Sequence, residues 1–219
     1  MTKSGRGSIY RVLDQPIVYG IAQSLLAPGH IGMLTRKLRA VTAARDGLQP
    51  MLDIGCGPES WLSRIGYDPY GIDLTASYVA RFVDSGGKGV VGNASCLPFA
   101  SGTFGSVWSV GLFHHMPDDA VRACLAEALR LCTVGGRVVV LDAVMPRNAL
   151  LRPLAYAIRK LDRGEFMRTE SELAKLVPAG VEYTLERFTY AATGLEIAQI
   201  EFVAAGQAAA SASSSAATT

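Results

Sequence analysis

The chain is poor in charge and in cysteine for its length. Only 18% of the 219 residues are charged, and the net charge is +2 at pH 7, so we expect no broad basic surface for nucleic acid. No apolar run approaches the about 18 uncharged residues of a membrane span, and the first residues lack the apolar core of a signal peptide. The four cysteines show none of the close paired spacing of a zinc site: Cys56, Cys96, Cys124 and Cys132. We therefore expect reduced thiols, no metal, no membrane span and a cytoplasmic location.

What the chain has is apolar sequence, enough for one compact core. Residues of the apolar types make up 49% of the sequence, and a chain of this length usually folds as one domain with additions. We expect an N-terminal helical cap at 1–45, a core at 46–204 that carries a lid insertion at 147–177, and a disordered tail at 205–219, where alanine, serine and threonine dominate.

Short apolar segments alternate with helical patterns along the core. This order predicts a doubly wound α/β fold, in which a mostly parallel sheet has helices on both faces. After the last parallel strand, Thr169 and Glu172 have capping-box spacing, and two strands around Thr193-Gly194 predict an antiparallel hairpin. Parallel strands are expected near 50–54, 70–72, 89–91, 106–110 and 137–142, and a helix that begins at Asp118 or Asp119 is expected to end at Gly135-Gly136.

A glycine loop follows the first predicted strand. Gly55 and Gly57 allow the backbone to turn with positive φ and to approach a ligand closely. Asp73 ends the next strand, where it can accept hydrogen bonds from two vicinal ribose hydroxyls. Together they predict a nucleoside-containing cofactor at the carboxyl ends of the strands.

Three further motifs follow this loop in order. They are Gly92–Phe99, which contains Leu97-Pro98-Phe99; Phe104–Asp118, which contains His114-His115; and Gly135–Asp142. In order and spacing the four motifs resemble those of the class I S-adenosylmethionine-dependent methyltransferases, in particular the small-molecule enzymes. The resemblance covers about Leu52 to Val144 closely.

The resemblance implies S-adenosylmethionine as cofactor and a role for each matching position. Asp53 and the loop Gly55, Cys56, Gly57 and Pro58 surround the methionine part, together with Gly111 after the fourth strand. Asp73 takes the ribose hydroxyls, Leu74 packs on adenine, and Asn93 and Ala94 read the edge of the ring.

Three positions depart from the family pattern. Asn93 replaces a usual aspartate, so it can accept a hydrogen bond but lacks the assistance of a charge. Glu59 replaces a third glycine, which puts the path of the loop in question, and the helix that follows, near 61–65, is expected to be short. Gly105 replaces a frequent aspartate.

His114 and His115 are the candidate catalytic residues. They follow the fourth strand at the edge where the methyl group should point, and imidazole titrates near neutral pH. A hydroxyl or acidic carbon acceptor needs a base for its proton. A structural role, with a ring bonded to a backbone carbonyl, stays open.

Tyr19, Arg163 and Arg168 are the candidate acceptor-binding residues. The two arginines flank Gly164 in a locally basic segment, and arginine can clamp a phosphate or carboxylate. The alternative is a solvated helix face with one structural ion pair to Asp162 or Glu165. Tyr19 lies in an apolar N-terminal segment that is expected to close over the pocket.

These observations favour an enzyme that transfers a methyl group to a small-molecule, sugar-containing or lipid-linked acceptor. Two alternatives stay open: a non-catalytic relative that acts as a partner subunit, and a nicotinamide-dependent reductase, which would want the glycine that Glu59 replaces. The sequence specifies neither the acceptor atom nor the oligomeric state.

Overall fold

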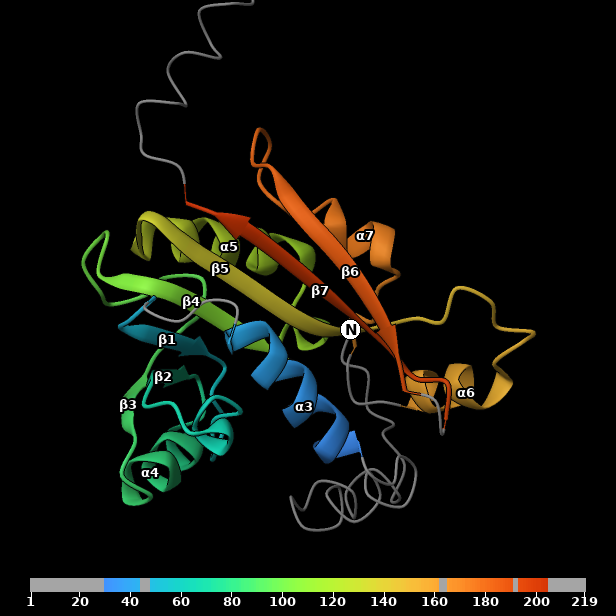
Figure 1. The fold of residues 1–219 in the computed structure, drawn as a ribbon, viewed down its shortest axis with the longest axis horizontal. Coiled ribbons are helices and arrows are strands. Elements are labelled where there is room, and N and C mark those ends of the chain that lie inside the picture. Colours follow the sequence, from blue (N-terminus) through green and yellow to red (C-terminus); the bar gives the residue numbers. More distant parts are fainter. Residues whose placement is uncertain (1–29, 44–47, 162–164, 191–192, 205–219) are drawn as a thin grey trace, which may run out of the picture.

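The computed structural model describes residues 30–43, 48–161, 165–190 and 193–204. Within these ranges a seven-stranded sheet with the order β3-β2-β1-β4-β5-β7-β6 forms the centre of the molecule (Figure 1). None of the helices in these ranges is both long enough and apolar enough to cross a bilayer.

Five strands run parallel and form the part of the sheet that the alternation predicts. They are β1 (Met51–Ile54), β2 (Tyr70–Asp73), β3 (Lys88–Val91), β4 (Phe104–Val110) and β5 (Cys132–Val144). The strands β1 and β4 are buried along their whole length, as strands covered on both faces must be. The doubly wound α/β fold is confirmed.

The predicted hairpin is also confirmed. β6 (Tyr183–Thr189) and β7 (Glu196–Val203) pair antiparallel, and β7 pairs antiparallel with β5 from Val144↔Glu196 to Arg137↔Val203. The start of β7 therefore lies beside the end of β5. The turn between the strands contains Gly194 at a φ of 75°.

Helices cover both faces of the sheet (Figure 1). On one face, α3 (His30–Ala43) packs Leu34, Leu38 and Val41 against β1, β4 and β5. On the other face, α5 (Asp118–Leu131) and the short α7 (Glu170–Ala174) enclose a larger apolar cluster. The remaining helices are α4 (Ala76–Asp84) beside β2 and β3, and α6 (Pro153–Leu161) after β5.

One local prediction is wrong, and another holds as a single turn. The helix predicted to end at Gly135-Gly136 ends at Leu131, because Cys132 to Gly136 extend β5, whose pairing with β4 shifts register at this end. The short helix expected at 61–65 is a single 3-10 turn, η1 (Ser63–Ile65), which ends at Gly66 with a φ of 99°. By contrast, the capping box of Thr169 and Glu172 is present at the start of α7.

The predicted N-terminal cap and C-terminal tail fall mostly outside the described residues. Residues 1–29 and 205–219 are not among the described residues. The described part of the predicted cap is α3.

Candidate functional site

The chemistry-bearing residues gather at one edge of the sheet. The register places Ile54 beside Ile72 and Ser109, and Val110 beside Leu141, so the parallel strands end together. The carboxyl ends of these strands carry Asp53, Asp73 and Asp142, and the loops after them carry the other predicted cofactor residues and the histidine pair. This is the edge at which doubly wound folds bind their ligands.

The glycine loop turns sharply after β1. The amides of Gly55 and Cys56 both donate to the carbonyl oxygen of Ile72, at 2.8 and 3.2 Å. Gly55 and Gly57 have φ values of 77° and 61°. A Cβ at Gly55 would lie 2.9 Å from the Leu112 side chain, whereas a Cβ at Gly57 would meet nothing within 4 Å. Gly55 is therefore held close to Leu112, and Gly57 presents an open backbone surface.

Glu59 does not disturb this loop. Among the described residues no side-chain-bearing residue has a positive φ, so position 59 does not require glycine. The Glu59 carboxylate instead pairs with Arg64 at 2.5 Å on the surface. The departure from the family pattern is accommodated by local backbone geometry.

Asp73 connects β2 to the glycine loop. Its Oδ2 accepts from the Gly57 amide at 3.1 Å and its Oδ1 accepts from the Thr75 amide at 2.8 Å. A carboxylate offers about four acceptor positions, so these two bonds orient the group and leave capacity for two more donors. A pair of vicinal hydroxyls would match that capacity.

Asp53 lies beneath the loop and is 2% exposed. Its Oδ2 accepts from Ser60 Oγ at 2.6 Å, and its Oδ1 has no hydrogen-bond partner among the described residues. Burial raises the pKa of Asp53 to about 7, against the lowering effect of the Ser60 bond and with a smaller raising contribution from Asp73. A buried carboxylate oxygen without a donor suits a ligand that brings a cation or an N–H group, so the residues of this edge fit the methionine part of the implied cofactor.

The predicted adenine positions are partly open. Leu74 follows Asp73 and is 74% exposed, although it is a large apolar side chain. The side-chain oxygen of Asn93 accepts from the Ser95 amide at 2.9 Å, so one of its two acceptor positions is used locally. Ala94 packs against the core, and its predicted contact with adenine stays a prediction.

The Cys56 side chain is packed inside the protein, so the predicted role of Cys56 at the cofactor would be played by its backbone. Its side chain is buried, and a Cβ on Gly71 would lie 2.7 Å from its sulfur, so the thiol fills the space that Gly71 leaves. Burial raises the pKa of Cys56 to about 12, which keeps the thiol protonated and unreactive. All four cysteines are free.

The two histidines differ in their surroundings. Both lie in the 3-10 turn η2 (Phe113–His115), where His114 is buried and His115 is exposed. The rings lie 4.0 Å apart at an interplanar angle of 43°. A Cβ on Gly111 would come within 4.0 Å of His114 Cε1, so the buried ring lies against the turn that ends β4.

Asp142 fixes His114 from the neighbouring strand. Its Oδ1 lies 2.6 Å from His114 Nδ1 and accepts from the Ala143 amide at 2.7 Å, while its Oδ2 accepts from the His114 amide at 2.9 Å. Since a carboxylate only accepts, Nδ1 carries the proton of the neutral ring and Nε2 keeps its lone pair. The backbone carbonyl of His114 accepts from the Phe166 amide at 3.1 Å, which joins the histidine turn to the predicted lid segment 147–177.

Arg168 is buried within the segment 147–177, the predicted lid. It is 7% exposed, and its guanidinium donates to Asp118 at 2.6 Å and to the carbonyl oxygens of Phe113 and Met116 at 2.7 and 2.6 Å. The acceptor clamp stays a prediction for Arg168, and these contacts favour the structural ion pair, with Asp118 in place of the partners that the sequence suggested. Arg163 and Tyr19 lie outside the described residues.

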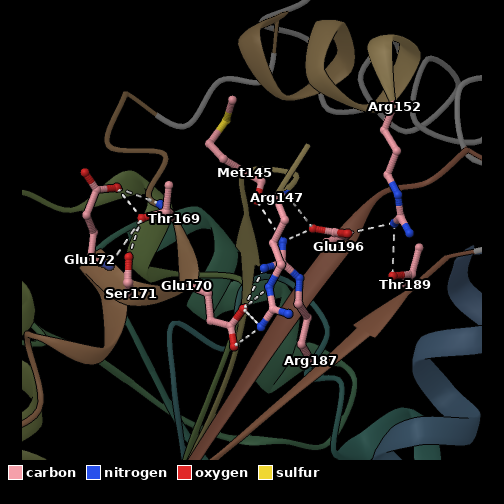
Figure 2. A network of polar contacts seen from close by, with 10 residues as sticks. All are labelled: Met145, Arg147, Arg152, Thr169, Glu170, Ser171, Glu172, Arg187, Thr189 and Glu196. Atoms are coloured by element: carbon pink, nitrogen blue, oxygen red, sulfur yellow. Dashed lines mark hydrogen bonds and ion pairs between the residues drawn. The ribbon is translucent and has the colours of Figure 1, made fainter. Parts of the chain in front are cut away.

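Arg147 and Arg152 of this segment join Arg187 of β6 in a network of ion pairs (Figure 2). Glu170 accepts from Arg147 at 2.8 Å and from Arg187 at 2.5 Å. Glu196 pairs with Arg152 at 2.7 Å and contacts Arg187. This network connects the segment after β5 to α7 and to both strands of the hairpin, so much of the local basic charge is neutralised.

Sequence reasoning missed three residues of this edge: Ser60, Leu112 and Asp142. Ser60 bonds Asp53, Leu112 packs over Gly55, and Asp142 holds His114. A signal existed for Asp142 alone, because β4 and β5 are neighbours in this fold and a carboxylate at the end of one faces the loop after the other.

Comparisons with known proteins agree with this geometry. The family model described as a methyltransferase domain matches residues 52–140. A 2-methyl-6-phytyl-1,4-hydroquinone methyltransferase of Synechocystis is 39% identical over 102 residues, which are 42% of this chain and 31% of that protein. A 27-O-demethylrifamycin SV methyltransferase of Amycolatopsis mediterranei is 29% identical over 164 residues, which are 68% of this chain and 59% of that protein.

A solved structure from Thermotoga maritima, described as a SAM-dependent methyltransferase and possible histamine N-methyltransferase, has a similar fold. Its TM-score is 0.66 at 16% identity, with 89% of this chain and 99% of that chain covered. The chain spans about a third and three fifths of the two curated relatives that it matches. The match of residues 52–140 to the methyltransferase domain model, the strand order and the glycine loop therefore point to the same kind of fold.

Proposed function

We propose that this chain is an S-adenosylmethionine-dependent methyltransferase that acts on a small, largely apolar acceptor. The observation that carries the proposal is the placement of Asp73, Asp53 and the open backbone at Gly57 on one edge of the sheet, beside a buried histidine held by a carboxylate. The family match over residues 52–140 supports it.

Each of the proposed cofactor residues would contact a different part of S-adenosylmethionine. Asp73 would take the two ribose hydroxyls with its remaining acceptor positions, and exposed Leu74 would pack on the adenine ring. Asp53 would meet the positively charged methionine part from below the loop, because its Oδ1 is otherwise without a donor. The adjoining backbone of Gly55, Cys56, Pro58 and Gly111, and the adenine-side residues Asn93 and Ala94, complete the proposed set.

When bound, S-adenosylmethionine supplies an electrophilic methyl group on a sulfonium, a good leaving group. The protein must therefore orient the acceptor and accept its proton. Asp142 holds Nδ1–H of His114, so Nε2 can take the proton of an acceptor hydroxyl, and Asp142 stabilises the resulting imidazolium. His115 would contact the acceptor from the exposed side of the turn.

The relatives' substrates support the acceptor class. One relative is named for a hydroquinone that carries a phytyl chain and the other for a rifamycin. We propose a hydroxyl-bearing, mostly apolar acceptor, and a role for Arg163, Arg168 or Tyr19 in holding it stays a prediction.

The first test is equilibrium binding by calorimetry with S-adenosylmethionine, S-adenosylhomocysteine and NADH. We expect both adenosyl ligands to bind and NADH not to bind. Asp73→Asn should weaken adenosyl binding about tenfold or more, because an amide loses the charge-assisted bonds. Asp84→Asn, an exposed aspartate at the end of α4, is the matched control and should bind normally.

The second test separates an enzyme from a non-catalytic relative. Labelled S-adenosylmethionine is incubated with the protein and a panel of hydroxylated apolar compounds, including quinols, and methyl transfer is followed by mass. Tight adenosyl binding without transfer to any compound would favour the partner subunit. NADH binding without adenosyl binding would favour the reductase and overturn the proposal.

A further inference from the structure

Three leucines project into solvent beside α6. Leu150, Leu151 and Leu154, here called the leucine ridge, are 92%, 80% and 56% exposed. Single exposed apolar residues are ordinary, but adjacent ones of this size on one projecting segment usually mark a contact surface. In Figure 1 the loop between β5 and α6 projects from the main body of the sheet, and α6 runs back from it toward the hairpin.

The ridge is built on a basic segment. Residues 145–161 contain four basic side chains, Arg147, Arg152, Arg159 and Lys160, and no aspartate or glutamate. Arg152 pairs with Glu196 and Arg159 is buried, so the basic side chains at the surface are Lys160 and Arg147, which pairs with Glu170 but is 70% exposed. Lys160 is exposed, and its Nζ lies 5.7 Å from the ring centroid of exposed Tyr156. Leucine and tyrosine beside lysine and arginine are typical of segments that lie in a membrane interface.

The polar side of the segment is fastened to the hairpin. Arg152 Nη1 donates to Glu196 at 2.7 Å and to Thr189 Oγ1 at 3.1 Å, and Figure 2 shows this side chain reaching from α6 to β7. Asn148 Oδ1 accepts from the amides of Leu150 and Leu151, at 3.0 and 3.1 Å. The backbone of the ridge is thus held in place while its leucine side chains point outward.

The segment is fastened at the same edge of the sheet that carries the candidate site. Glu196, which Arg152 contacts, is the register partner of Val144 at the end of β5, two residues beyond Asp142. The lid also bonds the histidine turn, from the Phe166 amide to the His114 carbonyl. A surface that docks on the ridge would therefore adjoin the acceptor side of the site.

Charge complementarity identifies what covers the ridge. A second copy of the chain would bring the same basic segment against itself. The N-terminal 29 residues contain Lys3, Arg6 and Arg11 against one acid, Asp14, so they are also basic. An occupant that is both apolar and anionic matches the segment, and a bilayer that contains anionic lipids has both properties.

We propose that the leucine ridge inserts into the surface of an anionic membrane, from which the acceptor enters the site. The docking itself stands on the ridge and its charges, and only the delivery of the acceptor rests on the proposed function. The leucines supply apolar burial, and the exposed cations Lys160 and Arg147 supply attraction to the headgroups.

The test is co-sedimentation of the full chain with vesicles of phosphatidylcholine, alone or mixed with phosphatidylglycerol. We expect binding to the mixed vesicles, little binding to phosphatidylcholine alone, and weaker binding at high salt. The double change Leu150→Ser and Leu151→Ser should weaken binding about tenfold or more, and Lys160→Gln about fivefold. The matched controls are Val134→Ser, a valine that is 80% exposed elsewhere, and Lys175→Gln, an exposed lysine outside the segment; both should bind normally.

Three results would overturn the proposal: no sedimentation with mixed vesicles, equal losses in the ridge variants and their controls, or a dimer in light scattering that the ridge variants dissociate. Calorimetry with S-adenosylhomocysteine on the ridge variants keeps the two proposals apart. Normal adenosyl binding without vesicle binding would leave the proposed function standing and reject the membrane contact alone.

Discussion

Replacing Asp53 by asparagine should stabilise the ligand-free protein, and more so at higher pH. The wild-type carboxyl is buried, and its Oδ1 has no hydrogen-bond partner among the described residues. Burial raises the pKa of Asp53 from its ordinary value of 3.8 to about 7. Folding therefore favours the protonated form and disfavours the ionised form.

The sign and size of the effect follow from linkage. Between pH 4 and 7 the native state keeps a proton that the unfolded state has lost, so wild-type stability falls as pH rises through this range. The full difference corresponds to about 4 kcal/mol above pH 7, of which about 2.5 kcal/mol is lost between pH 5 and pH 8. Asparagine keeps an acceptor for Ser60 and cannot ionise, so it lacks this loss.

The assay is urea unfolding of the wild type and of Asp53→Asn at pH 5 and pH 8, without cofactor. The advantage of the variant should grow by about 2.5 kcal/mol between the two conditions, since other titrating groups are common to both proteins and cancel. Parallel stability curves would refute the reasoning. The same variant should bind S-adenosylhomocysteine more weakly, because the buried anion is what meets the ligand's amino group.

The remaining predictions concern the histidine turn, the lid and the loop. His114→Gln should lower kcat about 10²–10⁴-fold for a hydroxyl acceptor and leave cofactor affinity unchanged, whereas His115→Gln should change kcat little. The measurements are steady-state kinetics and calorimetry with the cofactor. If both variants keep full turnover, the role of His114 is structural. Asp142→Asn should lower kcat and alter the pH profile of kcat, because the ring loses its fixed tautomer; an unchanged profile would contradict its positioning role. Arg168→Met should cost about 3 kcal/mol in urea unfolding, since it leaves buried carbonyls without donors, and full stability would show those contacts to be weak. Gly55→Ala should cost about 1–3 kcal/mol from strain at positive φ and should abolish adenosyl binding, while a stable variant that binds normally would show that the loop tolerates a side chain.

The sequence was most informative where structure depends on local rules. Alternation of apolar strands and helices predicted the parallel sheet, and the spacing of Thr169 and Glu172 predicted a helix start that the structure confirms. Local rules failed at Gly135-Gly136, where pairing of β5 with its neighbours prevailed over the tendency of glycine to end a helix. The sequence suggested that Glu59 would disturb the glycine loop, but it does not, because a glycine is required only where φ is positive and φ at position 59 is not.

The candidate site shows the same division between local and distant information. The glycine loop and Asp73 could be read from the sequence because they are adjacent in the chain and their spacing reflects one strand, one loop and the next strand. The partner of His114 is 28 residues away, and the Glu196 that neutralises Arg152 is 44 residues away. Which of two histidines is buried, and which arginines are already paired, depended on strand order and packing. Those are properties of the assembled sheet, because only folding brings such distant side chains within bonding distance.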